Sequence, residues 1–243
     1  MKSHEIFSNL LSVPPVFICL DGRGFHGIAD KWGLKRPFDG RFARAMANVS
    51  ERLIASSGLS PEFAYTFSDE ISLYFPNIPY SGRVEKIDSV TASYAASALT
   101  IEMSSPFPVA FDARIIQVSP ALALHYLISR QAEAWRNHIN AYCHHTLVTE
   151  GRSPHEAAKM LKGLSSSEMH EMMFSRGINL AKTPAWQRRG ILVHKTAKEI
   201  EGFNPLKSRV ERTLRTSVRC TQELPVFSSP EGRSFLTGLI REL

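Results

Sequence analysis

The chain has 243 residues, 43% of them hydrophobic and 21% charged, a composition that excludes a chain disordered throughout and allows a compact unit with a sizeable core. No apolar run approaches the roughly 20 residues of a membrane span and no secretory leader is recognisable, so we expect a cytoplasmic protein without a membrane partner. The formal net charge of +6 favours a polyanionic partner, and three cysteines at unrelated spacings favour neither a disulfide framework nor a zinc site.

The first half of the chain predicts alternating strands and helices. Residues 16–20 form a continuous apolar run, typical of a central strand, that ends at Asp21 and Gly22. A helix is predicted around residues 42–53, and two short strands, 64–67 and 71–75, are joined by an acidic turn. A second helix over 87–101 and a strand over 110–118 complete the order βαββαβ. This order indicates the ferredoxin-like arrangement that is also the palm of many polymerases and nucleotide cyclases.

The second half of the chain predicts mainly helices, beginning with a long one over residues 120–149. Most of the excess positive charge follows Lys195. Arg209, Arg212, Arg215 and Arg219 recur at spacings of three and four, so a helix there would carry one basic stripe suited to phosphates. A solvated surface helix or a flexible arm explains these charges equally well. We therefore expect an α+β fold, with a palm-like catalytic domain over residues 1–118 and a helical, basic, RNA-binding portion over residues 119–243, packed together as one unit.

Two acidic turns predict a metal site. In a βαββαβ sheet the first strand neighbours the central hairpin, so Asp21 and Asp69 can face each other. Facing carboxylates repel unless a cation lies between them, and Mg²⁺ prefers such oxygen ligands. Two such ions clamp the attacking and leaving oxygens in phosphoryl transfer. Glu70 either adds a ligand or holds a neighbouring base. Each acidic turn alone is more often an ordinary turn, but the pair on this topology favours a site.

Other residues suggest nucleotide or RNA contacts. The glycine-rich turn 22–26 can direct backbone N–H groups at phosphates, although it lacks the spacing of a P-loop. Arg36, Arg83 and Lys86 could neutralise a triphosphate or be solvated surface residues. One face of the long helix carries Arg130, Glu133 and Asn137. This face could contact a nucleotide or an RNA end, or it could be an exposed helix face stabilised by ion pairs.

As a set, these motifs resemble the tRNA-histidine guanylyltransferase family, and within it the archaeal and bacterial guanylyltransferase-like branch that extends RNA in the 3′–5′ direction. The matching blocks keep their order from about residue 14 to residue 196. They are Leu20–His26, Arg36–Asp39, Tyr65–Ser72, Phe111–Arg114, Arg130–Gln131, Arg136–Asn137, Gly177–Asn179 and Trp186–Gly190.

The resemblance implies a nucleotidyltransferase that activates the 5′-monophosphate of a tRNA with ATP or GTP. Pyrophosphate is released in this activation, and the 3′-hydroxyl of an incoming GTP then attacks the activated 5′ phosphate and displaces the nucleoside monophosphate. Asp21, the Gly22 carbonyl and Asp69 would hold two Mg²⁺ ions, supported by Glu70. With Arg83 added from the charge pattern, the expected nucleotide-binding residues are Arg23, Gly24, Phe25, His26, Arg36, Asp39, Ser68, Arg83 and Lys86. The expected RNA-binding residues are Arg130, Gln131, Arg136, Asn137, Arg188 and Arg189.

Several alternatives stay open at this point. Residues 135–138 depart from the His-Ile-Asn-Asn sequence of eukaryotic members, so templated repair of truncated tRNAs stands beside guanylylation of tRNA-histidine. The resemblance also implies a homo-oligomer, namely a tetramer. A palm-type nucleotide cyclase would use the same two acids but needs no RNA-facing helix. A catalytically silent RNA-binding protein would have kept the palm without its chemistry.

Overall fold

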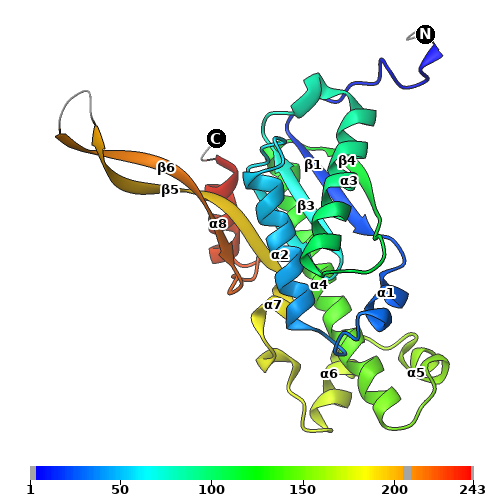
Figure 1. Ribbon diagram of the computed structural model, residues 1–243. Coiled ribbons are helices and arrows are strands. Elements are labelled where there is room, and N and C mark those ends of the chain that lie inside the picture. The colour runs from blue at the N-terminus through cyan, green and yellow to red at the C-terminus, as the bar shows by residue number, and fades with distance from the viewer. Residues whose placement is uncertain (1–3, 205–208, 242–243) are drawn as a thin grey trace.

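A six-stranded antiparallel sheet forms the centre of the computed structural model, which describes residues 4–204 and 209–241 (Figure 1). The strand order across the sheet is β4-β1-β3-β2-β5-β6. The strands are β1 (Val16–Gly22), β2 (Phe63–Phe67), β3 (Glu70–Phe75), β4 (Phe111–Gln117), β5 (Ile191–Asn204) and β6 (Arg209–Thr221).

Helices cover both faces of the sheet because its central strands are apolar on both sides. Successive side chains of a strand point to opposite faces. Ile18 of β1 therefore packs against α2 (Gly40–Ala55) and α3 (Val84–Glu102), whereas Phe17 packs against α4 (Pro120–Thr149) and α8 (Pro230–Arg241). Burial on both faces explains the unbroken apolar sequence of β1.

Short elements complete the chain. Helix α1 (Phe25–Lys31) follows β1, and the 3-10 turn η2 (Pro79–Gly82) precedes α3. Between α4 and β5 lie α5 (Pro154–Leu161), α6 (Ser166–Phe174), η3 (Leu180–Lys182) and α7 (Ala185–Arg189). Capping boxes built on Ser153 and Ser165 start α5 and α6, which pack against the second half of α4 in a separate small core.

A glycine closes the junction between α7 and β5. Gly190 has a φ of 74°, and a Cβ there would lie 2.6 Å from the hydroxyl oxygen of Tyr65. That hydroxyl donates a hydrogen bond to the Arg189 carbonyl at 2.9 Å. The close approach, which only glycine permits, fixes the point where β5 joins β2.

The expected α+β class, with an antiparallel sheet and helices in the βαββαβ order, is confirmed. The helix considered for the basic segment after Lys195 is wrong, because β5 and β6 form a long hairpin there (Figure 1). Thr213, Thr216 and Val218 are β-branched and favour a strand. Side chains alternate along a strand, so Arg212 points to the face opposite that of Arg215. None of the helices in the described part of the chain has the length and hydropathy of a membrane-spanning segment.

Candidate active site

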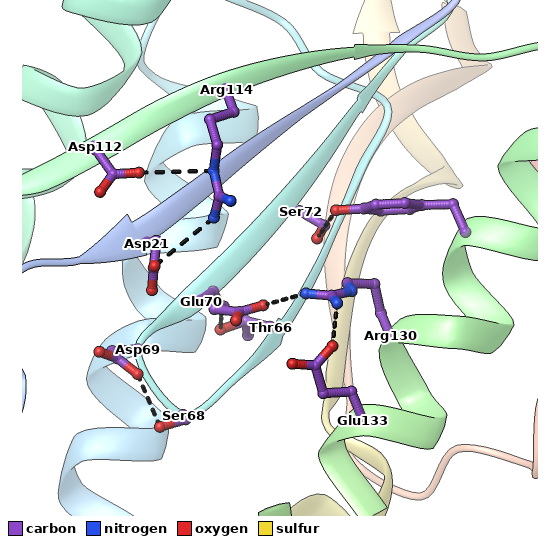
Figure 2. A network of polar contacts seen from close by, with 11 residues as sticks. Asp21, Thr66, Ser68, Asp69, Glu70, Ser72, Asp112, Arg114, Arg130 and Glu133 are labelled. Atoms are coloured by element: carbon purple, nitrogen blue, oxygen red, sulfur yellow. Dashed lines mark hydrogen bonds and ion pairs between the residues drawn. The ribbon is translucent and has the colours of Figure 1, made fainter.

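Two carboxylates meet at one end of the sheet. Asp21 lies near the end of β1, which pairs with β3 so that Asp21 is opposite Glu70. Asp69 lies in the tight turn from β2 to β3, beside Asp21 (Figure 2). A Cβ on Gly22 would lie only 3.0 Å from the Cβ of Asp69 and 2.5 Å from the ring of Phe25, so the glycine lets the turn approach β1. The predicted meeting of Asp21 and Asp69 is confirmed, whereas their chemical role stays a prediction.

The electrostatics of this end favour a bound cation. Burial raises the pKa of Asp69, the Ser68 hydroxyl that hydrogen-bonds to it at 2.9 Å lowers the pKa, and the negative charge of Asp21 raises it again. Arg114 of β4 lies 3.7 Å from Asp21 and 3.8 Å from Asp112 (Figure 2). A cation between Asp21 and Asp69 would favour the charged form of both acids.

Glu70 turns away from the other two acids. Its carboxylate accepts a hydrogen bond from the Arg130 guanidinium at 2.9 Å, and Arg130 also pairs with Glu133 on the same helix (Figure 2). Burial raises the pKa of Glu70, while Arg130 lowers it. Of the two roles considered for Glu70, the structure therefore favours holding a neighbouring base. The contact ties α4 to β3, and the charge of Arg130 is already balanced within the protein.

The donor set at this end fits a magnesium ion that binds together with a substrate. Asp21 and Asp69 offer carboxylate oxygens and Gly22 offers a backbone carbonyl, the hard ligands that Mg²⁺ prefers. Over residues 4–204 and 209–241, no cluster of three or more His, Cys, Asp or Glu side chains could hold a metal. Mg²⁺ usually completes its shell with water and substrate phosphates, so two protein carboxylates suffice.

A cavity of about 380 Å³ adjoins Asp69, within the size range of small-molecule sites. The glycine-rich turn borders it through Phe25 and His26, whose N–H groups have no intrahelical acceptor because they belong to the first turn of α1. The Arg23 N–H, in contrast, is bonded to the Ala110 carbonyl. Other expected nucleotide-binding residues on the wall are Arg36, Asp39 and Ser68, and α4 contributes Asn137.

Asp39 has a clear local role at the cavity wall. It caps α2, accepting hydrogen bonds from the backbone N–H groups of Lys35 at 2.9 Å and Arg41 at 2.7 Å. Burial raises the pKa of Asp39, but these bonds and the Arg41 guanidinium outweigh burial and hold it at about 2. The nearby Arg36 forms an ion pair with Asp30 at 2.6 Å. Asp39 therefore shapes the loop around the cavity.

The structure does not bring Arg83 and Lys86 to this cavity. Ser12, which precedes β1, lies against the end of η2, and its backbone N–H donates a hydrogen bond to the Gly82 carbonyl at 2.8 Å. Helix α3 therefore begins near the start of β1, whereas Asp21 lies near its end, about 20 Å away along the strand. Lys86 instead lies over the ring of Tyr80. This cavity therefore gives no support to the expected nucleotide-binding role of these two side chains, which stays a prediction.

The expected RNA-binding residues divide into buried and exposed ones. Gln131 is 6% exposed and its side chain bonds to the backbone of the C-terminal segment, which favours a structural role over the expected RNA contact; that contact stays a prediction. Arg188 and Arg189 donate to the carbonyls of Thr183 and Leu224, beside a second cavity of about 250 Å³. Arg136 and Asn137 are exposed on α4.

Arg114 is a site residue that the sequence interpretation missed as such. The register of β1 with β4 places Asp112 opposite Asp21, so Asp112, Asp21 and Glu70 form a row across three strands. Arg114 lies two positions along on the same face. The sequence signal for this was the alternation of apolar and charged residues over Phe111–Arg114, on the strand that borders β1.

Two family models match the chain. The model described as tRNAHis guanylyltransferase matches residues 1–119, and the one described as Thg1 C terminal domain matches residues 122–226. The probable tRNA(His) guanylyltransferase of Dictyostelium discoideum is 29% identical over 212 residues, which is 80% of each chain. The tRNA(His) guanylyltransferase of Schizosaccharomyces pombe is 29% identical over 78% of this chain and 77% of that protein. For tRNA(His) guanylyltransferase 1 of Arabidopsis thaliana, identity is 27% over 85% of this chain but only 39% of that longer protein.

Solved structures share the fold. A bacterial tRNA(His) guanylyltransferase (Thg1)-like protein in complex with GTP aligns with a TM-score of 0.75 and 24% identity over 99% of this chain and 97% of that chain. Such a protein in complex with ATP gives a TM-score of 0.77, again with 24% identity and coverage of 99% and 97%. The tRNA(His) guanylyltransferase of Saccharomyces cerevisiae gives 0.70 with 21% identity, over 79% of this chain and 91% of that chain.

Proposed function

The chain belongs to the tRNAHis guanylyltransferase family, and from this premise we propose that it adds nucleotides, chiefly GMP from GTP, to the 5′ end of tRNA in the 3′–5′ direction. The observation that carries the proposal is the placement of Asp21 and Asp69 at one end of the sheet, beside a cavity of nucleotide size. A nucleotide cyclase would need the acids and the cavity alone. The second matched family model, over residues 122–226, favours the tRNA enzyme instead.

We propose that residues 1–118 carry the chemistry and residues 119–243 the RNA contacts. Two bound Mg²⁺ ions would neutralise phosphate charge and activate the attacking hydroxyl. Asp21, the Gly22 carbonyl and Asp69 hold these ions, and Ser68 keeps the Asp69 carboxylate in place. The ion pair of Glu70 with Arg130 fixes α4 against the sheet.

The cavity is the proposed nucleotide site. Its wall includes apolar side chains such as Phe42 and Trp186, which exclude water, and the N–H groups of Phe25 and His26, which suit phosphate oxygens. The similar bacterial proteins in complex with GTP and with ATP support both as substrates, one for activation of the 5′-monophosphate and one for addition. Arg136 and Asn137, exposed on α4, are the proposed contacts to the RNA end. A cytoplasmic homotetramer, as in the family resemblance, completes the proposal.

A gel assay tests this function. Purified protein, Mg²⁺, ATP and labelled GTP are incubated with 5′-monophosphorylated tRNA-histidine that lacks its extra guanosine, and in parallel with a 5′-truncated tRNA of another specificity. Extension of the 5′ end supports the proposal, and the preferred RNA chooses between guanylylation and repair. Cyclic product from GTP alone would instead support a cyclase.

A matched pair of variants tests the role of the acid. Asp69→Asn should lower the rate of addition by about 10³-fold, the effect of losing several kcal/mol of transition-state stabilisation, with little change in tRNA affinity. Glu150→Gln makes the same acid-to-amide change at an ion pair with Arg176, away from the cavity, and should leave the rate intact. Addition at the normal rate by Asp69→Asn would remove Asp69 from the mechanism. RNA binding that is indifferent to Mg²⁺, with no addition by the unchanged protein, would indicate a silent binding protein.

A further inference from the structure

The β5–β6 hairpin separates its charges by face. Residues directly opposite each other in an antiparallel pair share a face, and side chains alternate along each strand. Lys198 is opposite Arg215, and Arg219, four positions from Arg215, lies on the same face, which we call the basic face. Thr196 and Ser217 belong to it too, and their hydroxyls are 2.9 Å apart. Lys195 and Arg212 lie on the other face, which we call the paired face.

The cations of the two faces differ in their partners. On the paired face, Arg212 pairs with Glu201 at 2.8 Å and approaches Glu199 to 4.0 Å, and Lys195 pairs with Glu62 at 3.2 Å. On the basic face, Lys198, Arg215 and Arg219 have no acidic partner among the side chains that the structure describes. Among the described side chains, one face of the hairpin is therefore neutralised within the protein, and the other carries three cations without an acidic partner.

The hairpin extends well beyond the sheet. Strand β2 pairs with β5 only as far as His194, and from there β5 and β6 continue as a two-stranded ribbon away from the body (Figure 1). Ten residues of β5 follow His194, which corresponds to a length of about 30 Å. An isolated two-stranded hairpin is marginally stable in water, and unpaired like charges add repulsion. A ligand that neutralises the basic face would relieve this cost.

We infer that the basic face of the β5–β6 ribbon binds the phosphate backbone of the tRNA substrate, at a part of the RNA remote from the cavity that receives its 5′ end. The identity of the RNA rests on the proposed function, whereas the polyanion follows from the unpaired cations. Double-stranded RNA is recognised mainly through phosphates and 2′-hydroxyls, so cations on an extended ribbon suffice without base contacts. At the base of the ribbon, Leu192 packs in the core beneath α4 and α8, so the basic face begins on the same side of the sheet as Arg136.

A pair of double variants tests the inference. Lys198→Gln/Arg215→Gln removes two charges from the basic face, and Lys195→Gln/Arg212→Gln removes the same two charges from the paired face of the same strands. Each lost phosphate contact lowers the slope of log K against log salt by about 0.8. The basic-face variant should therefore raise the Kd for tRNA by about tenfold at 200 mM salt and about a hundredfold at 50 mM salt. The paired-face variant should change the Kd much less.

Further readouts separate this inference from the proposed function. At saturating tRNA the basic-face variant should add nucleotide at the normal rate, with only the KM for tRNA raised, and Lys198→Arg/Arg215→Lys should retain the wild-type Kd. If the unchanged protein adds no nucleotide but the basic-face variant still weakens RNA binding in this salt-dependent way, the proposed function fails and the ribbon contact stands. Equal Kd values and equal salt slopes for the basic-face variant and the unchanged protein would overturn the inference. Loss of oligomer in sedimentation, with an unchanged Kd for tRNA, would also overturn it and assign the ribbon to contacts between copies of the chain.

Discussion

Substitution of Gln131 distinguishes a structural role from an RNA contact at one position. Its side-chain oxygen accepts a hydrogen bond from the Phe227 N–H at 2.7 Å, and its amide nitrogen donates to the Pro225 carbonyl at 3.1 Å. Gln131→Met fills a similar volume but leaves both backbone groups without their partner. A buried group left unsatisfied costs about 1–3 kcal/mol, so the two together predict a loss of about 4 kcal/mol in the free energy of unfolding. For a chain of this size that loss lowers Tm by about 10 °C.

Thermal and urea unfolding, each followed by circular dichroism, measure this loss. Gln131→Glu keeps the acceptor for Phe227, but its ionised carboxylate would be buried against the Pro225 carbonyl, so at neutral pH it should be destabilised at least as much as Gln131→Met. Arg136→Met is the matched control, because Arg136 is exposed on the same helix and should lose tRNA affinity without losing stability. A Gln131→Met protein that unfolds like the unchanged protein, yet binds tRNA weakly, would refute the structural role.

Two further predictions concern a histidine and a glycine. Burial holds the pKa of His138 at about 4, below the ordinary value near 6.5, so protonation favours the unfolded chain. The stability that His138 contributes is complete above pH 6.5 and decreases by about 3 kcal/mol as the pH falls to about 4. Urea unfolding at several pH values measures this decrease, and the His138→Phe protein should not show it. The same decrease in the variant would contradict the assignment of this pH dependence to His138. Gly22→Ala should reduce the rate of nucleotide addition by more than about tenfold while tRNA affinity persists. The added Cβ would meet Phe25 and push the turn that carries Asp69, and a displacement of the Asp69 carboxylate by a few tenths of an ångström or more is costly in catalysis. Addition at the normal rate would show that the turn tolerates the methyl group.

Local patterns predicted those parts of the fold that depend on neighbouring residues. The apolar run before Asp21 predicted β1, and the acidic turn at Asp69 predicted the β2–β3 hairpin. The long helix over residues 120–149 has the predicted bounds. The meeting of Asp21 with Asp69 followed from the strand order, since adjacent antiparallel strands bring the end of one beside the start of the next.

Features that depend on distant segments were not predictable in this way. Gln131 is a polar residue on a helix, and only the return of the segment around Phe227, 96 positions later, makes it an interior residue. The position of Arg83 depends on which end of β3 leads into α3. The arginine spacing after Lys195 is compatible with either a helix or a strand, and pairing of this segment with β5, which itself pairs with β2, selects the strand.

The return of the C-terminal segment bears on how the protein is made. Leu224, Phe227 and Leu236 cover Phe17 and Tyr65 on the α4 side of the sheet. A nascent chain that has emerged only through the palm-forming residues would expose this aromatic surface and lack β5 as the neighbour of β2. The sheet that begins in the first half of the polypeptide is therefore complete only after β5 and β6 have been synthesised. An N-terminal fragment that ends before β5 should therefore expose this aromatic surface and aggregate rather than fold independently.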